Sequence, residues 1–518
     1  MATLTGVVTL AFVLFVCIIV RLTSNRRRRG RIPPGPWGWP FIGNALDVPN
    51  AYAWKAFAKW SKNWGDIMML NLLGQRVMIL NSPSLAFELL DKKSAVYSGR
   101  PAFPVITEIM GWERETALRP YGPALKELRK LITQTIGNRT ALLGLSTSLE
   151  HEALDFLCRV MSDPKTLRRQ VDRYTTASIL RITYGYNIKE DGDELVNVVK
   201  RAVETLSLAS APGAYLADVF PILTRIPAWF PGAGWKRQAQ AWRVHHTMMY
   251  ELPFKYSKQQ LQAGTLEPCF VSKHLEDCDD PEREALIADA ASSIFAGMWA
   301  TTIGAILAFF LAMTCFPEKQ KKVQDEIDNI IGNDRLPCVT DLDRLPNVKA
   351  LCWEVLRWHA IFPLGKSTHP INVGAPHRLT EDDVHAGYFI PKGTTVFTNI
   401  WAMLRDHRLY SKPEEFNPDR FVPSDGSEPE YDPRQICFGF GRRICPGMQF
   451  AEMSLSLVVA MTLSVFNISK PVVNGKVVEP SLQFAANLIS HPLPFECDIR
   501  PRSAKAAALL SSALDGRA

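Results

Sequence analysis

The chain has 518 residues, 47% of them hydrophobic, so it can bury a large core, and no linker divides it. Its formal net charge of +7 is mild for this length, and basic and aromatic residues are not interleaved, so no nucleic acid is expected as a partner. The ten cysteines form no C-x-x-C pair, which argues against a zinc knuckle or a thioredoxin-type site.

Residues 1–31 predict a membrane anchor with a basic flank. Residues 4–20 are almost entirely apolar and would form a helix about 26 Å long, short but workable for a bilayer core of about 30 Å. Six arginines follow this run and none precedes it, so the positive-inside rule places the N-terminus in the lumen and the body in the cytosol. A cleaved signal peptide, the alternative, usually carries its charge before the apolar run.

Two segments that flank the body of the chain differ from it in composition. Residues 32–44 contain four prolines, which lack the amide donor that a helix needs, so we expect a stiff hinge that stops the anchor helix. Residues 504–518 are rich in small side chains, and we expect a disordered tail there.

Residues 45–503 predict one catalytic domain that is mainly α-helical with small β-sheets. Short β runs at 66–72 and 76–81, separated by Gly74, predict a hairpin. Helical periodicity dominates the rest of the domain. It is clearest at 83–315 and 318–331, with a return to strand character at 384–399.

The strongest local signal is the loop FGFGRRICPG at residues 438–447. Its glycines permit a tight turn around a bulky group, and Pro446 suits the first position of the apolar helix that follows. Cys445 would then lie at a helix N-terminus, where the macrodipole and free amides favour the thiolate. Such a thiolate is a reactive nucleophile or a metal ligand, and Arg443 could pair with an anionic group of a bound species.

This loop resembles the haem-binding signature of the cytochrome P-450 family, F-x-x-G-x-R-x-C-x-G. The matching positions are Phe438, Gly441, Arg443, Cys445 and Gly447. The resemblance, which covers nearly the whole chain, implies the P-450 fold and heme b, with Cys445 as the axial ligand to the iron. Cys437 precedes the phenylalanine, so the pattern excludes it as the ligand.

Two further segments resemble the family's bracing network. Glu354 and Arg357 are three positions apart on a predicted helix and can form a local ion pair. Arg420 lies in FNPDRF, which resembles the family's F-x-P-E-R-F segment with Asp419 in place of the glutamate. The resemblance implies that Glu354, Arg357 and Arg420 form a buried network that braces the cysteine loop.

The family's oxygen-activating motif, [A/G]-G-x-[D/E]-T-[T/S], falls on residues 297–302 of a long predicted helix. Gly297 and Thr301 share a face, which places a gap beside a hydroxyl. The resemblance implies catalytic roles for Thr301 and Thr302, with Thr301 on the dioxygen side. Ala300 stands at the acid position, so the carboxylate that relays protons is missing. The alternative for both threonines is helix packing with hydroxyls bonded back to the helix.

Two other regions depart from the family pattern. Leu125 replaces the tryptophan of the family's W-x-x-x-R segment, whereas Arg129 remains as a candidate partner of a haem propionate. About nine extra residues at Lys366–Gly374 interrupt a region that borders the family's substrate pocket. They represent either a remodelled pocket or an error in the gene model.

The resemblance implies a monooxygenase that inserts one oxygen atom of O2 into a lipophilic small molecule. Electrons would come from NADPH through a separate NADPH-cytochrome P-450 reductase, because the chain carries no dinucleotide-binding fingerprint. Arg442 and Arg443 either contribute to its docking surface or face the haem or solvent. Similarity to microsomal enzymes of basidiomycete fungi implies the endoplasmic reticulum membrane and secondary metabolism of terpenoid or polyketide type. The alternatives are a haem-thiolate isomerase or dehydratase without O2 activation, and an inactive haem-binding membrane protein.

Overall fold

The computed structural model describes residues 31–189, 192–210, 215–276, 278–364, 376–423, 426, 428–486 and 489–515. The predicted anchor, apart from Arg31, and the Lys366–Gly374 insertion lie outside the described residues. Within the described part, α12 (Pro281–Cys315) and α17 (Met448–Val465) are long and apolar enough to span a bilayer, but 72% of each apolar window is buried. They are therefore the core helices of the body.

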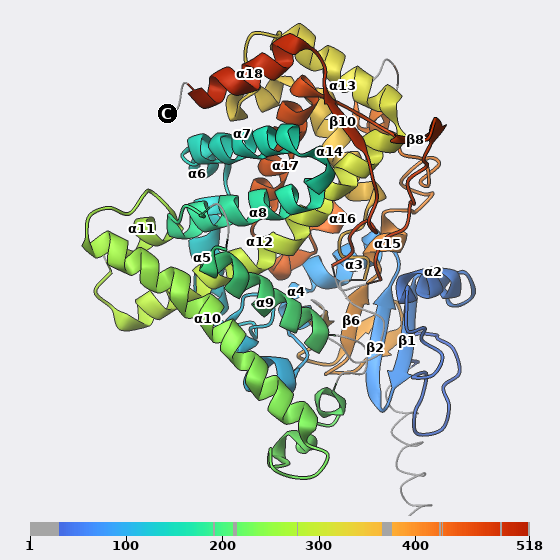
Figure 1. Cartoon of the computed structure of the whole chain (residues 1–518). Helices are drawn as coiled ribbons and strands as arrows, with labels where there is room; N and C mark the ends of the chain where they lie inside the picture. Colours follow the sequence, from blue (N-terminus) through green and yellow to red (C-terminus); the bar gives the residue numbers. More distant parts are fainter. Residues whose placement is uncertain are drawn as a thin grey trace, which may run out of the picture.

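Helices form most of the molecule (Figure 1). The 35-residue α12 runs through its middle and packs against helices on several sides. Asp280 caps its first turn, Pro281 is its first residue, and Pro317 begins the next helix directly after the turn at Phe316. The other long helices are α5 (Pro123–Ile136), α7 (Ser146–Ser162), α8 (Leu167–Tyr184), α9 (Glu194–Ala209), α10 (Gly234–Gln262), α13 (Pro317–Ile330) and α14 (Pro346–Trp358).

The strands form small sheets, and the largest of them lies at the side of the helical body where the described chain begins (Figure 1). The largest has the order β1 (Ile67–Leu72), β2 (Gln75–Leu80), β6 (Thr395–Thr398) and β3 (His377–Arg378). β1 and β2 are antiparallel, with Ile67 opposite Leu80, and Gly74 in their turn has a φ of +86°. The hairpin and the mainly α fold class with small sheets are therefore confirmed. Two-stranded ladders pair β4 (Asp383–His385) with β5 (Tyr388–Ile390), β7 (Phe466–Ser469) with β10 (Asp498–Pro501), and β8 (Val472–Val473) with β9 (Lys476–Val477).

Short helical segments connect these elements and carry most of the site. The α-helical ones are α2 (Ala53–Trp64), α3 (Pro83–Ala86), α4 (Ser94–Tyr97), α6 (Arg139–Leu143), α11 (Phe270–Leu275), α15 (Ile400–Met403) and α16 (Arg434–Cys437). Wider π-helical turns occur at η1 (Phe87–Lys92) and η2 (Val105–Ile109). Tighter 3-10 turns occur at η3 (Trp112–Arg114), η8 (Pro418–Phe421) and η9 (Gly441–Arg443). The main core surrounds α12, α17 and α7, and a smaller one lies beneath the four-stranded sheet.

The C-terminal segment differs from its prediction. Ala504–Asp515 form helix α18, so the prediction of a disordered tail is wrong for these residues. Alanine is a strong helix former, and Leu510 is fully buried in the main core, where α18 packs against α7 and α17. Arg502 pairs with Asp328 at 2.5 Å just before the helix begins. Small side chains in this segment thus serve packing.

Candidate haem-thiolate site

The cysteine loop connects α16 to α17 and is shaped by its backbone. The Cys445 amide donates to the Phe438 carbonyl at 2.8 Å, which closes the loop. Gly441 has a φ of +56°, and a Cβ atom there would lie 2.0 Å from the carbonyl oxygen of Leu90 in η1. Only glycine fits this position, because any side chain would collide with that backbone.

The Cys445 side chain lies deep within the molecule, yet solvent can reach it, so a ligand can approach the sulfur. Burial raises the pKa of its thiol, while the Gly447 amide and the charge of Arg129 act in the opposite direction. Helix α17 begins at Met448 with Gly447 as its cap, so Pro446 is not its first residue as predicted. The helix cap still directs an amide at the sulfur. Burial also raises the pKa of Cys437, which lies just outside the loop.

A cluster of buried cations lies beside the loop. Arg129 donates from Nη2 to the Ile444 carbonyl at 2.7 Å, and Arg443 donates from Nε to the Ser98 carbonyl at 3.0 Å. Burial and the neighbouring charge of Arg129 lower the pKa of Arg443 to about 10. Burial and these two guanidiniums also hold the pKa of Arg100 well below its usual value.

Arg129 and Arg443 lack a balancing negative charge within the described residues. In the described part of the chain no carboxylate forms an ion pair with Arg129 or Arg443, and the buried Nη2 atom of Arg443 has no hydrogen-bond partner. Buried charges of one sign are strongly unfavourable unless an anion joins them. The two propionates of a haem would supply that anion beside a sulfur able to bind its iron, so the residues fit heme b.

Arg100 and His377 were not found from the sequence. Arg100 donates from Nη1 to the Pro376 carbonyl at 2.7 Å, and burial followed by the charge of Arg100 lowers the pKa of His377 to about 3. They adjoin the cluster only because Gly99 pairs with Arg378 across more than 270 positions. No local pattern marks either residue. The side chain of Leu125, at the family's tryptophan position, is buried and has no hydrogen-bond donor.

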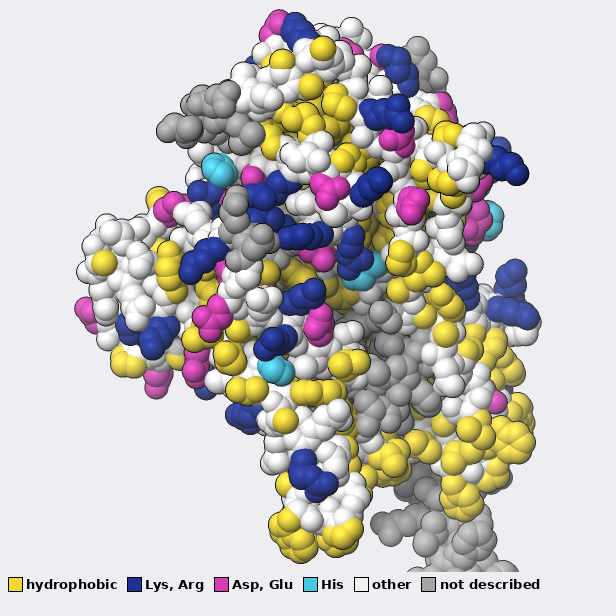
Figure 2. All heavy atoms as spheres, in the orientation of Figure 1, with side chains coloured by type: hydrophobic (Ala, Val, Ile, Leu, Met, Phe, Trp, Pro, Cys, Tyr) yellow, Lys and Arg dark blue, Asp and Glu magenta, His cyan; other side chains and the backbone are white. Residues whose placement is uncertain are grey.

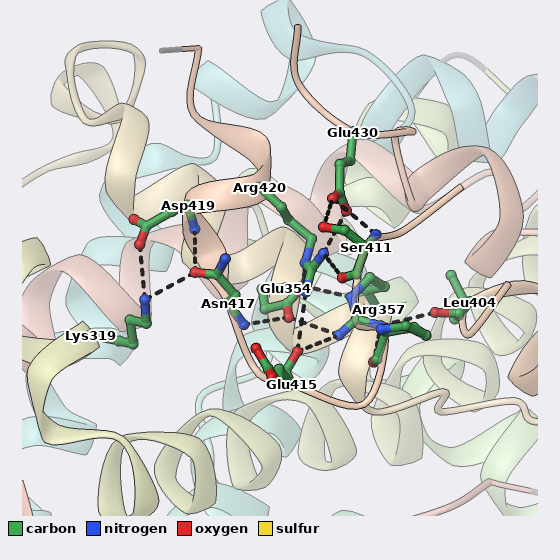
Figure 3. Close-up of polar contacts among 11 residues, drawn as sticks. Lys319, Glu354, Arg357, Leu404, Ser411, Glu415, Asn417, Asp419, Arg420 and Glu430 are labelled. Carbon is green, nitrogen blue, oxygen red and sulfur yellow. Dashed lines mark hydrogen bonds and ion pairs between the residues drawn. The ribbon is translucent and has the colours of Figure 1, made fainter. Parts of the chain in front are cut away.

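The predicted bracing residues meet in the structure (Figure 3). Arg357 donates from Nε and Nη2 to the two carboxylate oxygens of Glu354 at 2.7 and 2.8 Å, and both side chains are fully buried. Nε of Arg420 lies 3.3 Å from Glu354 Oε2. The Asn417 amide donates to Glu354 Oε1 at 2.7 Å, so the network also holds the FNPDRF segment.

Glu430 completes the network and was missed from the sequence. It accepts from Arg420 Nη1 at 2.5 Å, so two carboxylates face two guanidiniums (Figure 3). Burial raises the pKa of Glu430, but hydrogen bonds from Ser411 and Arg420 outweigh it, and the pKa lies below its usual value. Asp419, at the family's glutamate position, points elsewhere and pairs with Lys319 and Lys322 at 2.9 and 2.6 Å.

A second bracket spans the cysteine loop. Arg434 of α16 pairs with Glu452 of α17 at 2.7 Å, and its guanidinium lies 4.1 Å from the ring centroid of Trp353 in α14. The two ends of the loop are thus tied to each other and to the helix that carries Glu354. The sequence had given no sign of this pair.

Comparison with known proteins identifies the family. The cytochrome P-450 family model matches residues 33–497. The chain belongs to the cytochrome P-450 family. It is 48% identical to cytochrome P-450 monooxygenase 208 of Postia placenta, over 97% of this chain and 96% of the relative. It is 40% identical to cytochrome P-450 monooxygenase claR of Ampulloclitocybe clavipes, over 98% and 93% of the two chains.

A solved structure supports the fold. A zebra fish cytochrome P-450 solved with abiraterone matches with a TM-score of 0.69 at 21% identity, over 87% of this chain and all of that one. The predictions of a P-450 fold and of an oxygen-incorporating oxidoreductase are therefore confirmed. The family implies a haem-thiolate iron cofactor. The roles of individual site residues stay predictions.

In this P-450, α12 carries both predicted catalytic threonines. The Thr301 hydroxyl donates to the carbonyls of Gly297 and Met298 at 3.0 and 3.1 Å, the back-bonded arrangement of the packing alternative. Its oxygen keeps acceptor capacity, and Gly297 leaves this face of the helix open. Thr302 is half-buried on the same turn, and Ala300 is buried.

A cavity of about 290 Å³ lies away from this site. It is bounded by α7, α18 and the segment around Cys338, and it reaches Met461 in α17. At about 1.5 Å per residue, Met461 is roughly 20 Å along the helix from the end nearest Cys445. The cavity therefore does not belong to the cysteine site.

Proposed function

We propose that this P-450 is a monooxygenase that inserts one oxygen atom of O2 into a lipophilic small molecule. The observation that carries the proposal is the approachable sulfur of Cys445 beside Arg129 and Arg443, neither of which has a carboxylate partner among the described residues. When bound, heme b supplies reductive activation of O2, and an axial thiolate donates electron density to iron and favours O–O cleavage.

The chain's own residues divide into four tasks. Cys445 binds the iron, and Phe438, Gly441 and Gly447 shape the loop that presents it. Arg129 and Arg443, with Arg100 and His377, hold the propionates. Glu354, Arg357 and Arg420 keep the loop in place, since their charges are satisfied within the chain. Thr301 and Thr302 would face the bound haem from α12, and the Thr301 oxygen, beside the open face at Gly297, would accept a hydrogen bond from water.

Apolar side chains support a lipophilic substrate. Phe103, Val105, Ile106 and Trp112 are buried on the segment that, by family resemblance, borders the substrate pocket. Fungal relatives named as monooxygenases, among them ple1 of Rhodocybe pseudopiperita at 36% identity, support the oxygen-inserting reaction. Secondary metabolism with terpenoid or polyketide substrates is the finer part of the proposal.

NADPH-cytochrome P-450 reductase is the proposed electron donor. Arg442 lies exposed with its guanidinium 5.1 Å from the ring centroid of Tyr121, and Lys126 lies 5.6 Å from the same ring. These cations, next to the cysteine loop, offer a docking surface for an acidic flavoprotein.

The endoplasmic reticulum membrane is the proposed location, with a single N-terminal span and a cytosolic body. Trp37 and Phe41 are each 93% exposed in the hinge, and Trp229 is 78% exposed before α10. Figure 2 shows hydrophobic side chains gathered at the lower end of the molecule, where the hinge and the segment before α10 lie. Gln75 of β2 donates to the Val219 carbonyl at 3.3 Å, so the four-stranded sheet contacts the segment between α9 and α10. Exposed aromatic residues of this kind suit a membrane interface.

The test compares two cysteine variants and assays the reaction. Cys445→Ala is expected to abolish the thiolate-type carbon monoxide difference spectrum, whereas Cys437→Ala keeps it. Microsomes that contain the protein and its reductase are then fed a panel of terpenoids and polyketides. NADPH-dependent oxygenation of one of them supports the proposal. Conversion without NADPH would support an isomerase or dehydratase instead, and a normal spectrum without any conversion would support an inactive haem protein.

A further inference from the structure

The distal face of α12 lacks the family's acid but has a basic side chain against it. Gly304 lies four positions after Ala300 and three after Thr301, so it neighbours both on the helix surface. A Cβ atom on Gly304 would lie 3.2 Å from Nδ1 of His491 and 3.2 Å from the Ser490 carbonyl oxygen. The imidazole therefore packs onto the helix one turn beyond Ala300, and glycine at 304 makes the room for it.

His491 is held by its neighbours. The Ser490 amide donates to the Ile361 carbonyl at 2.8 Å, and the Ser490 carbonyl lies 2.9 Å from His359 Nε2. The Ala485 amide donates to the carbonyl of His491 itself at 2.8 Å. The backbone on both sides of the imidazole is thus pinned, which fixes the ring against α12.

The imidazole of His491 has one unpartnered nitrogen and is uncharged at neutral pH. Its buried Nδ1 atom has no hydrogen-bond partner among the described residues. Burial, followed by the charge of Arg168, lowers the pKa of His491 to about 4, and its neighbour His359 has a pKa lowered to about 3, chiefly by burial. At neutral pH both rings are uncharged, and a neutral imidazole has one N–H and one lone pair.

Arg168, whose charge acts on His491, lies at the surface of the molecule. Arg168, in the first turn of α8, is 55% exposed and pairs with Asp172, Nε to Oδ1, at 3.3 Å. The charge of Arg168 acts on the imidazole from the α8 side. His491 is itself half-buried, so part of the residue reaches solvent, and its Nδ1 faces Gly304 on α12, one turn after Thr301.

We propose that His491 is the proton-relay residue that replaces the missing carboxylate at position 300. It receives a proton on one ring nitrogen and releases one from the other to water held beside Thr301. The ring stays neutral but changes tautomer, and proton exchange with water restores the first tautomer before the next transfer. The protons are those that O2 reduction consumes together with the electrons of NADPH. His491 acts through Thr301 and water, so it is a positioning residue. The inference rests on the proposed function.

The first experiment follows the fate of electrons in the full-length protein with its reductase, without added substrate. His491→Gln is expected to keep the thiolate-type spectrum and the melting temperature but to slow O2 reduction by about 10²-fold and raise the share released as peroxide. His274→Gln in α11, a half-buried histidine near Thr135, is the matched control and should behave as the unaltered protein. His491→Asn serves if the glutamine variant does not fold.

The second experiment uses Ala300→Asp in both backgrounds. In His491→Gln it is expected to restore the lost O2 reduction, which a purely structural role for His491 would not allow. In the otherwise unaltered protein the new carboxylate should raise the pKa of His491 by about 1–3, measured by NMR of ¹³C-labelled histidine in the carbon monoxide form, with His491→Gln identifying the resonance.

The outcomes separate the two proposals. If the unaltered protein shows the thiolate-type spectrum and His491→Gln reduces O2 at the unaltered rate, the relay alone is overturned. A His491 resonance whose titration Ala300→Asp does not move would also overturn it. Absence of the thiolate-type spectrum in the unaltered protein would overturn the proposed function and the relay with it.

Discussion

Two buried arginine clusters flank the cysteine loop, and they differ in how their charge is balanced. Arg357 and Arg420 face the carboxylates of Glu354 and Glu430, so the bracing network is electrically complete within the chain. The second cluster contains Arg129 and Arg443 and has no carboxylate partner among the described residues. Arg443 is buried and Arg129 half-buried, and of the two clusters only this second one calls for an external anion.

The difference separates a structural role from a binding role. A satisfied ion network contributes to holding the loop whether or not a cofactor is bound. An unsatisfied cluster destabilises the empty protein and is relieved by binding, so part of the binding free energy comes from charges already buried. Each cluster should therefore respond differently when one member is removed.

The largest effect is expected for Glu354→Gln. The change leaves two buried guanidiniums short of one negative charge, and breaking such a network costs about 3–5 kcal/mol of the free energy of unfolding. Urea unfolding of the purified protein measures the loss. A loss below about 1 kcal/mol would show that the network is not the brace inferred from its geometry.

The second-largest expected effect is on the pH dependence of stability, and it comes from His377 beside the second cluster. The folded apoprotein holds the pKa of His377 near 3, below the value of about 6.5 in an unfolded chain. The unfolded state therefore binds more protons below pH 6.5, and stability falls as the pH is lowered towards 3. The contribution lost by pH 4 is on the order of 3 kcal/mol. In His377→Asn the acid limb of apoprotein stability should be shallower by this amount, and an unchanged limb would contradict the assignment.

Arg443→Leu should weaken haem binding without destabilising the apoprotein. A hydrogen bond to a charged group is worth about 1.5–3 kcal/mol, so haem loss should accelerate by roughly 10–100-fold. Transfer of haem to an excess of an apo-globin measures the rate, and thermal melting of the apoprotein is the companion measurement. An apoprotein that melts much earlier than the unaltered one would place Arg443 in the same class as Arg357.

The smallest effect is expected for Asp419→Asn. Its side chain is 41% exposed and pairs only with Lys319 and Lys322, outside the network, although the family has an acid here. Surface pairs of this kind contribute about 0–1 kcal/mol. A loss close to that of Glu354→Gln in the same urea titration would mean that the acid belongs to the network after all.

Sequence reasoning reached the features whose cause is local. The hairpin at Gly74, the apolar α12 and the glycines of the cysteine loop follow from backbone conformation and side-chain periodicity within a few residues. Glu354, Arg357 and Arg420 were found through the family pattern, and the structure brings them together. The prediction of a disordered C-terminal tail was wrong because the packing partner of α18, helix α7, lies more than 300 residues earlier in the chain.

Other parts of the site could not be found from sequence. Glu430, Arg434 and Glu452 have no distinctive local pattern, and Arg100 approaches His377 only through the pairing of Gly99 with Arg378. Their roles depend on long-range pairing of charges. A single sequence does not specify which distant charges meet.

By itself, then, the sequence determined the family, and it predicted the thiolate ligand and the missing acid at Ala300, because each of these depends on residue type at a short fixed spacing. Only the tertiary structure decided which side chain packs near the position of the missing acid. The contact of His491 with Gly304 joins positions 187 residues apart, and it exists because Ser490 is pinned to Ile361 and His359. Spacing along the chain encodes local geometry, whereas the environment of a buried proton route is set by which distant segments pack together.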